Sequence, residues 1–455
     1  TASDTDVFVA RVHPNGNLDT SYGTNGGWTR INLSDGIHPT GGTNAADAAG
    51  YDIFVRPNQK AIFSAAIGTD SNGTRTARDA AAVQLSANGQ LDTSFGKDGI
   101  ASIPTPFSDN LRRGLLEEDG SYFTTAYASV GASNQPFISK FDSTGKADAS
   151  WGDDGLATAY PGGLGGFAEA YGIKKDSLGN YLISAYGYRG GRTGDAASNG
   201  VDALLFSLKP DGTLNKDWAD RGLLAYHVGD DGNGSADRHR NHVVLPDGRI
   251  VGVGSSGVSG SINALITVTP PDGTPGTVHS IDLGGTTDDV FWGVTTVGNG
   301  YQVVAAGVGN NDAKLATLDL TPESSTTAVA LAKASTTFGG ANTATVNLKV
   351  GGAAAAGEVT VSVDGKKVQS VSVSNSGTAS VALPKTLSVG KHTVTAEFAP
   401  APGIAGSKAS ASVTVNKAGS ATSLKLSASK IKKSKRATAM IKITGSGVPS
   451  GYYPT

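Results

Sequence analysis

Short apolar runs alternate with polar turns along the first two thirds of the chain. In one unit, residues 201–208 form a β-rich run that ends at the turn Lys209-Pro210-Asp211-Gly212. Proline suits the second position of such a turn, and glycine suits a position that needs a positive φ. A second run at 222–228 and a pair of runs around Pro246-Asp247-Gly248 follow. Because Asp-Gly between two apolar runs is a strong hairpin signal, the pattern predicts a unit of four antiparallel strands.

The same unit recurs along the chain. Segments that match the first strand lie at 6–12, 79–85, 137–141, 203–208, 264–268 and 313–318, and matching hairpins lie at 51–67, 114–127, 172–186, 242–254 and 293–306. Serial units of this length predict a β-propeller. We favour five blades over six, with the strand at 313–318 completing a blade begun elsewhere and closing the ring. A β-solenoid is the competing repeat fold, but its periods are shorter and its rungs lack paired hairpins.

One phrase is repeated between the strands. It ends in an aromatic residue followed by glycine in three copies, and it occupies residues 17–23, 90–96, 146–152 and 213–219. Its Asp or Asn can close an Asx turn, its Ser can add backbone hydrogen bonds, and its aromatic ring can staple the loop between blades. Because the phrase recurs from blade to blade, we interpret it as scaffold and not as a functional site.

These repeats resemble the delta-60 repeat family of bacterial extracytoplasmic proteins, whose pattern is L-P-D-G-K-I-…-L-N-P-D-G-x-L-D-T-S-F-G-x-x-G. The resemblance covers about residues 1–320 and is most specific in the first two copies. The third copy has Ala147 in place of leucine, the fourth reads Asn215-Lys216-Asp217-Trp218-Ala219, and the fifth, at 271–276, has lost the phrase. The resemblance implies a propeller-like fold, and it implies no particular reaction.

The composition shifts near Thr321, where Ala, Val, Ser, Thr and Lys become dominant. Residues 359–363 alternate strictly between apolar and polar and then turn at Asp364-Gly365, and 377–383 and 392–398 alternate as well. Period-two strands of this kind predict a β-sandwich with one buried face per sheet. The order of motifs from Gly357 to Val415 closely resembles bacterial Ig-like repeats of surface proteins, and the resemblance implies a stalk or spacer.

Residues 421–426 match 325–331 and begin a second Ig-like copy. This copy stops at Thr455, too early to bury a core, so we expect the natural chain to continue and this one to be a fragment. The predicted domains are therefore a propeller at 1–322, an Ig-like domain at 323–417 and the start of an incomplete second one at 418–455.

The amino-acid composition excludes several classes of site and partner. The chain has no cysteine, which excludes a disulfide scaffold, a thiolate metal site and a cysteine nucleophile. A net charge of −2 gives no reason to expect a nucleic-acid partner. No apolar run is long enough to span a membrane. With the surface-protein resemblance, these features predict an extracellular or cell-surface location.

Metal-ligand candidates are weak. Asp231, Asn233, Ser235 and Asp237 alternate as the oxygen ligands of a calcium loop do, but Ala236 replaces the glycine of the sharp turn and His242 replaces the closing glutamate. We therefore expect a solvated loop and no cofactor, with calcium as the alternative. His227, His239 and His242 lie near one another in sequence, but zinc needs three or four convergent ligands, so a polar loop is the default interpretation.

No catalytic constellation emerges, so the sequence favours a non-enzymatic protein. The carboxylates of 117–119 and 153–154 are adjacent in sequence and point to opposite sides of a strand or fall at turns. Residues 254–257 lack the spacing of a serine nucleophile elbow. The basic run at 430–436 is interpreted as a solvated strand edge. Aromatic residues of the inter-blade loops could stack on sugars, and these candidate ligand-binding residues are Tyr160, Phe167, Tyr186, Tyr188 and Trp292.

Two functions are weighed. The first is a non-catalytic binding or adhesion protein, a propeller presented on an Ig-like stalk to an extracellular protein or glycan. The alternative is a secreted polysaccharide hydrolase or lyase with its site at the propeller funnel, and a pure spacer is a third possibility. Inward acidic or histidine side chains from several blades would favour the enzyme. An exposed aromatic or polar face would favour binding.

Overall fold

The computed structural model describes residues 6–33, 49–71, 74–105, 107–130, 133–158, 167–188, 201–228, 237–258, 261–284 and 288–445. The described residues form strands and turns and contain no helix. The chain divides into two compact units, Thr1–Leu320 and Thr321–Thr455. The predicted boundary at 322/323 falls two residues after this division.

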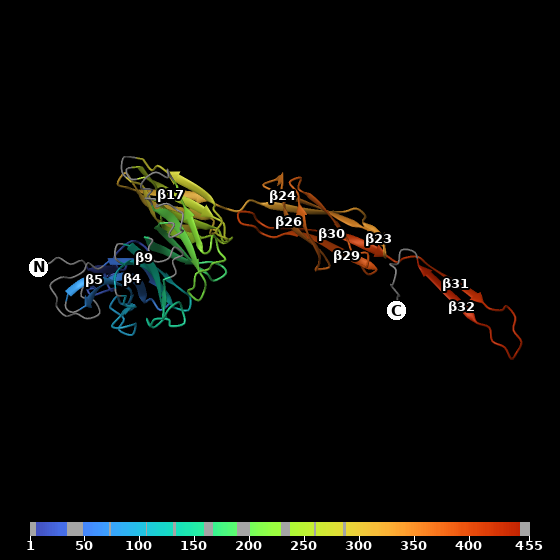
Figure 1. Ribbon diagram of the computed structural model, residues 1–455, viewed down its shortest axis with the longest axis horizontal. Helices are drawn as coiled ribbons and strands as arrows, with labels where there is room; N and C mark the ends of the chain where they lie inside the picture. Colours follow the sequence, from blue (N-terminus) through green and yellow to red (C-terminus); the bar gives the residue numbers. More distant parts are fainter. Residues whose placement is uncertain are drawn as a thin grey trace. The chain divides into compact units, whose positions relative to one another are not determined.

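Four sheets of the first unit have four antiparallel strands in chain order (Figure 1). The first of these sheets contains β3 (Ala49–Val55), β4 (Ala61–Ser71), β5 (Thr74–Leu85) and β6 (Ile100–Ser102), and the second contains β7 (Ser108–Leu116), β8 (Tyr122–Val130), β9 (Ser133–Phe141) and β10 (Leu156–Ala157). The third contains β11 (Ala168–Lys175), β12 (Tyr181–Gly187), β13 (Asp202–Leu208) and β14 (Leu223–Tyr226), and the fourth contains β15 (Arg238–Val244), β16 (Ile250–Val258), β17 (Ser261–Thr269) and β18 (Thr277–Ile281). Four antiparallel strands per sheet agree with the prediction, but the predicted grouping is wrong: the strands at 201–208 and 222–228 end the third sheet, and the hairpin at 242–254 begins the fourth. The structure places each hairpin before, and not after, the two strands with which it forms a sheet.

A partial sheet stands at each end of this series. β1 (Val7–Ala10) pairs with β2 (Trp28–Ile31), and β19 (Val290–Val297), β20 (Gln302–Gly309) and β21 (Asp312–Asp319) form a three-stranded sheet. The predicted strand at 313–318 is thus present, but it pairs with β20 inside its own sheet. Among the described residues, no ladder joins β1 or β2 to the last sheet.

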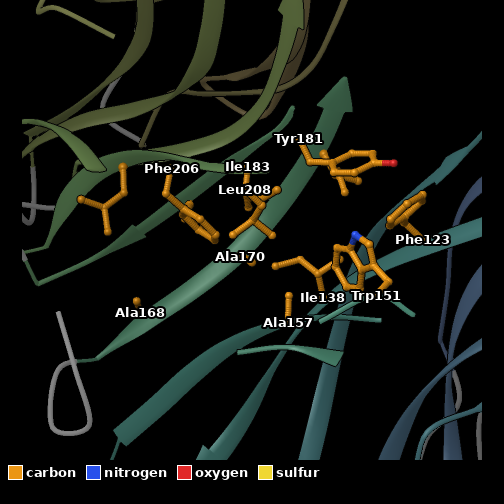
Figure 2. Packing of buried hydrophobic residues seen from close by; sticks show 13 residues of the cluster. Phe123, Ile138, Trp151, Ala157, Ala168, Ala170, Tyr181, Ile183, Phe206 and Leu208 are labelled. Carbon is orange, nitrogen blue, oxygen red and sulfur yellow. The ribbon is translucent and has the colours of Figure 1, made fainter. Parts of the chain in front are cut away.

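Neighbouring sheets pack face to face, which buries both sides of the central strands. Every residue of β12 and β13 is buried. Between the second and third sheets, Phe123, Trp151, Tyr181 and Phe206 belong to one apolar cluster (Figure 2). Strands buried on both faces explain why these segments are continuous apolar runs. The predicted fold class is confirmed: the chain is all-β, a propeller followed by an Ig-like domain.

The repeated phrase joins each sheet to the next. Its aromatic residues Tyr22, Phe95, Trp151 and Trp218 are buried. Each ring packs under a glycine of the following turn, so closely that a Cβ on Gly212 would lie 2.8 Å from the Trp151 ring. The backbone N–H of Gly152 also donates to the Asp211 carbonyl at 2.8 Å. The predicted scaffold role of the phrase is confirmed, and we call these contacts the staple loops.

The Ig-like domain is a sandwich of two sheets. One contains β22 (Ser325–Leu331), β24 (Thr343–Val350), β25 (Ala353–Ala354) and β28 (Thr378–Ala382), and the other contains β23 (Ser335–Thr337), β26 (Gly357–Val363), β27 (Lys366–Val373), β29 (Gly390–Phe398) and β30 (Ser407–Asn416). Val346, Val361 and Val394 lie in its buried core. β31 (Ser420–Leu426) and β32 (Ala439–Gly445) form a separate hairpin whose side chains are all exposed.

Candidate functional site

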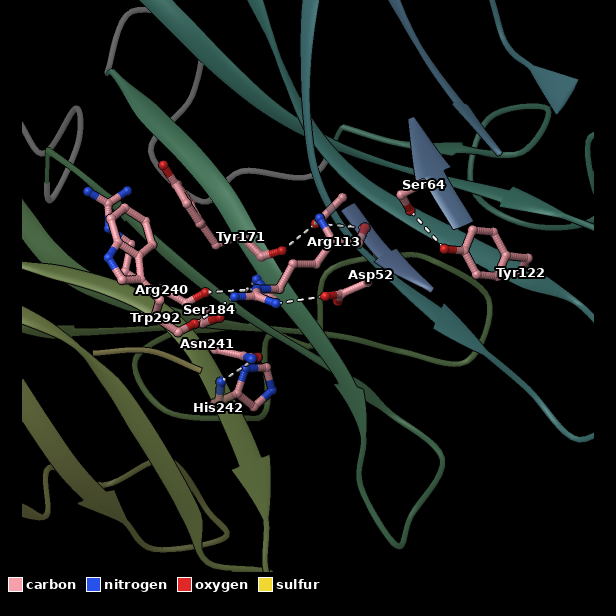
Figure 3. A network of polar contacts seen from close by, with 12 residues as sticks. Asp52, Ser64, Arg113, Tyr122, Tyr171, Ser184, Arg240, Asn241, His242 and Trp292 are labelled. Carbon is pink, nitrogen blue, oxygen red and sulfur yellow. Dashed lines mark hydrogen bonds and ion pairs between the residues drawn. The ribbon is translucent and has the colours of Figure 1, made fainter. Parts of the chain in front are cut away.

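The first strand of each of the last five sheets carries a β-bulge. The first strands of neighbouring sheets contact one another, so the bulges face a common centre. A bulge leaves a residue outside the ladder and redirects its side chain. The residues that the ladders skip are Asp52, Arg112, Arg113, Tyr171, Arg240 and Trp292. With Glu169, Tyr186 and Arg238, which contact members of this group, we call these residues the central cluster. Figure 3 shows Asp52, Arg113, Tyr171, Arg240 and Trp292 of this cluster.

Arg113 links several sheets and is fully engaged. Its Nη1 donates to Oδ1 of Asp52 at 2.7 Å, and its Nη2 donates to the backbone carbonyl of Trp292 at 2.6 Å. Its Nε lies 3.4 Å from the carbonyl of Arg240. These contacts reach β3, β15 and β19 from β7. The Arg113 side chain therefore positions the centre and has little capacity left for a ligand.

Arg112 is paired as well. Its Nη2 lies 3.1 Å from Oε2 of Glu169 and donates to the Tyr127 hydroxyl at 3.0 Å. The guanidinium stands over the rings of Tyr127 and Tyr171, 4.8 and 4.7 Å from their centroids. Glu169 also accepts from Asn134 at 2.8 Å. Both carboxylates of the central cluster are thus held in ion pairs with arginine.

Arg240 is different, because its charge is surrounded by aromatic rings. Its guanidinium lies 4.6 Å from the Tyr171 centroid, 5.0 Å from Tyr186 and 4.7 Å from Trp292. The residue is only 8% exposed, and its Nε is buried without a hydrogen-bond partner. In the part of the chain that the structure describes, no carboxylate pairs with Arg240. Contacts with rings offset part of the cost of burying such a cation.

The predicted aromatic residues meet at this place. Phe167 lies 5.8 Å from Tyr186 and 5.7 Å from Tyr188 between ring centroids, and Arg240 connects Tyr186 to Trp292. Tyr188 and Trp292 are 40% and 43% exposed, so part of the group faces solvent. Tyr160 lies outside the described residues. The proximity is observed, and ligand binding by these residues stays a prediction.

Sequence reasoning missed the arginines and Tyr171. The signal that could have found them is the divergence of the copies just before each hairpin, where Arg112-Arg113-Gly114, Tyr171-Gly172 and Arg240-Asn241 occupy corresponding places. Staple positions keep an aromatic residue from copy to copy, whereas these positions differ in chemical type.

His239 and His242 are fully buried, and they do not gather with His227 as ligands of one site. Nδ1 of His239 donates to the Leu204 carbonyl at 3.2 Å, and its Nε2 lies 3.0 Å from the Thr267 hydroxyl. Burial lowers the pKa of His239 to about 4 and holds that of His242 well below its ordinary value. The two imidazoles are neutral members of the sheet interior, and the zinc interpretation of the three histidines receives no geometric support from the described residues.

Asp237 is the only residue of the predicted calcium loop that the structure describes; Asp231, Asn233 and Ser235 lie outside it. Asp237 gathers with Asp202 and His227, their ligand atoms lying within 4.8 Å of one another. Its carboxylate accepts from the backbone N–H groups of Val228 and Gly257 at 2.6 and 2.9 Å. Nδ1 of His227 lies 2.9 Å from Asp202. This triad could hold a divalent cation or a shared proton, and the expectation of no cofactor, with calcium as the alternative, stays a prediction.

Besides Asp237, whose pKa burial raises to about 6, two further buried carboxyl groups have a raised pKa. Burial raises the pKa of Asp109 to about 7 and that of Asp79 to about 6. Asp109 is completely buried and accepts from the Thr105 hydroxyl at 2.7 Å. A substrate cannot reach such a group, so this pair gives no catalytic site. Glu117 and Asp119, at the turn noted in the sequence, bond to Lys175 and Ser121.

Residues 323–416 match the model of the bacterial Ig-like domain (group 3). No match to the delta-60 repeat was found, so that similarity stays a resemblance. No curated protein matches the chain in sequence. No helix able to cross a membrane occurs in the described part of the chain.

Solved structures with a similar chain path include glycoside hydrolases. An endo-arabinase from Bacteroides thetaiotaomicron is 12% identical with a TM-score of 0.32, and the alignment covers 59% of this chain and 92% of that chain. A GH43 endo-arabinanase from Bacillus licheniformis is 17% identical with a TM-score of 0.29 over the same shares. A glycosyl hydrolase from Bacteroides ovatus is 10% identical with a TM-score of 0.27, covering 60% and 83%. Values this low transfer no activity, so the function of this chain has to be argued from its own residues.

Proposed function

We propose that this chain is an extracellular or cell-surface carbohydrate-binding protein without catalytic activity, and that the central cluster is its binding site. The observation that carries the proposal is the meeting of Tyr188 and Trp292, both partly exposed, with Tyr186 around the guanidinium of Arg240. Aromatic faces supply apolar contact area at low conformational cost, and buried polar groups beside them give orientation. Three sheets contribute residues to this site. Contacts from several directions are what recognition of a ligand by its shape requires.

Hydrolysis at the same place is the alternative, and the charges of the centre disfavour it. Cleavage of a glycosidic bond uses two carboxyl groups on opposite sides of the bond, one as acid and one as base or nucleophile. Asp52 and Glu169, the two carboxylates of the central cluster, are each held by an arginine, at 2.7 and 3.1 Å. Carboxylates whose oxygens are held by guanidinium groups are not free to contact the two sides of a glycosidic bond. The cluster therefore fits binding better than acid–base chemistry.

The features of the Ig-like domain fit a spacer that displays the propeller. The Ig-like domain has a continuous buried core, and its described surface offers no cluster of His, Asp or Glu ligand groups. A domain with this composition suits a spacer that holds the propeller away from an anchoring surface. The extracellular location is part of the same proposal.

The test is titration calorimetry of the full chain against neutral plant and bacterial oligosaccharides, with reducing-end release measured on the same samples. Trp292→Ala should weaken binding of the best oligosaccharide at least about tenfold, since stacked rings are typical hot spots. Trp28→Ala is the matched control, because Trp28 is a comparably exposed tryptophan in β2 of the two-stranded sheet, outside the central cluster. Equal binding by Trp292→Ala and the wild type would contradict the proposed site. Release of reducing ends by the wild type would favour the hydrolase.

A further inference from the structure

We infer that the central cluster selects acidic glycans and that Arg240 binds their anionic group, a carboxylate or a sulfate. The inference rests on the proposed function and names the class of its ligand. Arg240 is a buried guanidinium for which the described residues provide rings but no carboxylate. A buried charge needs a partner of opposite sign or pays a large desolvation cost.

Two neighbouring arginines, Arg112 and Arg113, each have a carboxylate partner. Arg113 has Asp52 and two backbone carbonyls, and Arg112 has Glu169 and a tyrosine hydroxyl. Among the described residues Arg240 has neither, and Arg238, the fourth arginine of the cluster, likewise contacts a ring and has no carboxylate partner. Two arginines of the centre are therefore without an anion in the described residues, and Arg240 is the one that stands beside the partly exposed ring of Trp292.

A ligand can approach the guanidinium of Arg240 from the side of Trp292. Figure 3 shows its guanidinium beside the indole of Trp292 and turned away from the Arg113–Asp52 pair. Trp292 is 43% exposed, so the side of the stack that it forms is open to solvent. A ring-stacked guanidinium keeps its N–H edges free for two parallel hydrogen bonds to a carboxylate or sulfate. A sugar ring against Trp292 would place such a substituent next to Arg240.

The wider charge distribution also favours an anion. The central cluster contains four arginines (Arg112, Arg113, Arg238 and Arg240) and two carboxylates (Asp52 and Glu169). The chain as a whole has a net charge of −2, so this is a local concentration of positive charge. Such a concentration raises the local density of anionic ligands and makes their binding sensitive to salt.

The experiment compares matched ligands on the full chain by titration calorimetry. The probes are an oligogalacturonate, the same oligosaccharide with its carboxylates methyl-esterified, a sulfated dextran fragment and unmodified dextran of equal length. We expect the wild type to prefer at least one charged probe over its neutral counterpart about tenfold or more, the size of a charge-assisted hydrogen bond. Preference for the uronate assigns a carboxylate, and preference for the sulfated dextran assigns a sulfate.

Arg240→Gln should abolish that preference while neutral binding persists, and Arg240→Lys should restore part of it. Arg221→Gln, which removes a cation that is 72% exposed, should leave the preference unchanged. Melting curves show whether each variant is folded. A preference retained by folded Arg240→Gln, or a wild type that binds neutral and charged probes equally, overturns this inference alone. If no probe binds, or Trp292→Ala has no effect on any of them, the proposed function fails with it.

Discussion

The staple loops and the central cluster are built from the same repeat, but they use it in opposite ways. Each staple position keeps an aromatic ring, from Tyr22 to Trp218, and each ring packs under the glycine of the next turn. Each central position keeps the bulge but changes the residue, from Asp52 through Arg240 to Trp292. Identity between copies therefore marks packing that every sheet interface needs, and divergence marks a site made once.

The largest effect is expected at a staple glycine. Gly212 has φ +84°, and a Cβ there would lie 2.8 Å from the Trp151 ring and 2.9 Å from the Gly152 nitrogen. Gly212→Ala should lower the free energy of unfolding by about 3 kcal/mol, through backbone strain and overpacking together. Urea denaturation measures it. Gly16→Ala is the control, because Gly16 has the same φ but no atom within 4 Å of its Cβ, and we expect about 1 kcal/mol there. Equal losses would show that packing against the ring is unimportant.

A smaller effect is expected in the centre. Asp52→Ala leaves Arg113 without its carboxylate, and both side chains are about a quarter exposed. Solvent screens part of the loss, so the free energy of unfolding should fall by about 1–2 kcal/mol. Asp217→Ala is the control, since this carboxylate is 89% exposed and 3.7 Å from Lys209. If both variants are as stable as the wild type, the Arg113 pair does not hold the centre together.

The sequence predicted the staple side of this comparison better than the central side. Strands, turns and aromatic staples depend on spacing within a few residues, so the recurrence of the phrase around Trp151 was enough to interpret it as scaffold. The central cluster depends on bulges in strands that are far apart in sequence, and no local pattern places Arg113 beside Asp52. Phe167, Tyr186, Tyr188 and Trp292 were predicted to lie in inter-blade loops, which is wrong for Tyr186 in β12 and Trp292 in β19. Packing of the sheets brings the four residues together.

The metal candidate shows the same limit. Alternating oxygen ligands suggested a local loop, but Asp237 meets Asp202 and His227. Asp202 belongs to β13 and His227 directly follows β14, so the sheet ladders decide this contact. Local spacing contains no information about it.

The pH dependence of the free energy of unfolding tests the scaffold independently of the binding site. Burial raises the pKa of Asp109 to about 7 and of Asp79 to about 6, so the folded state binds their protons more tightly than the unfolded state. Their stabilisation is complete below the ordinary carboxyl pKa and is lost as the pH rises through 6 to 7. Relative to the wild type, Asp109→Asn should gain stability as the pH rises from about 4 to about 7.5, because the wild type alone loses the proton of this buried carboxyl group; urea denaturation at several pH values measures it. A difference that stays constant with pH would contradict this assignment.

The most direct test uses the four tryptophans as reporters. Fluorotryptophan labelling gives one ¹⁹F resonance for each of Trp28, Trp151, Trp218 and Trp292, assigned by single Trp→Phe variants. During titration with the best-binding oligosaccharide, the resonance of Trp292 should shift in a saturable way while those of the staple residues Trp151 and Trp218 stay in place. A saturable shift at Trp28 or at the staple residues with Trp292 unmoved would contradict the account.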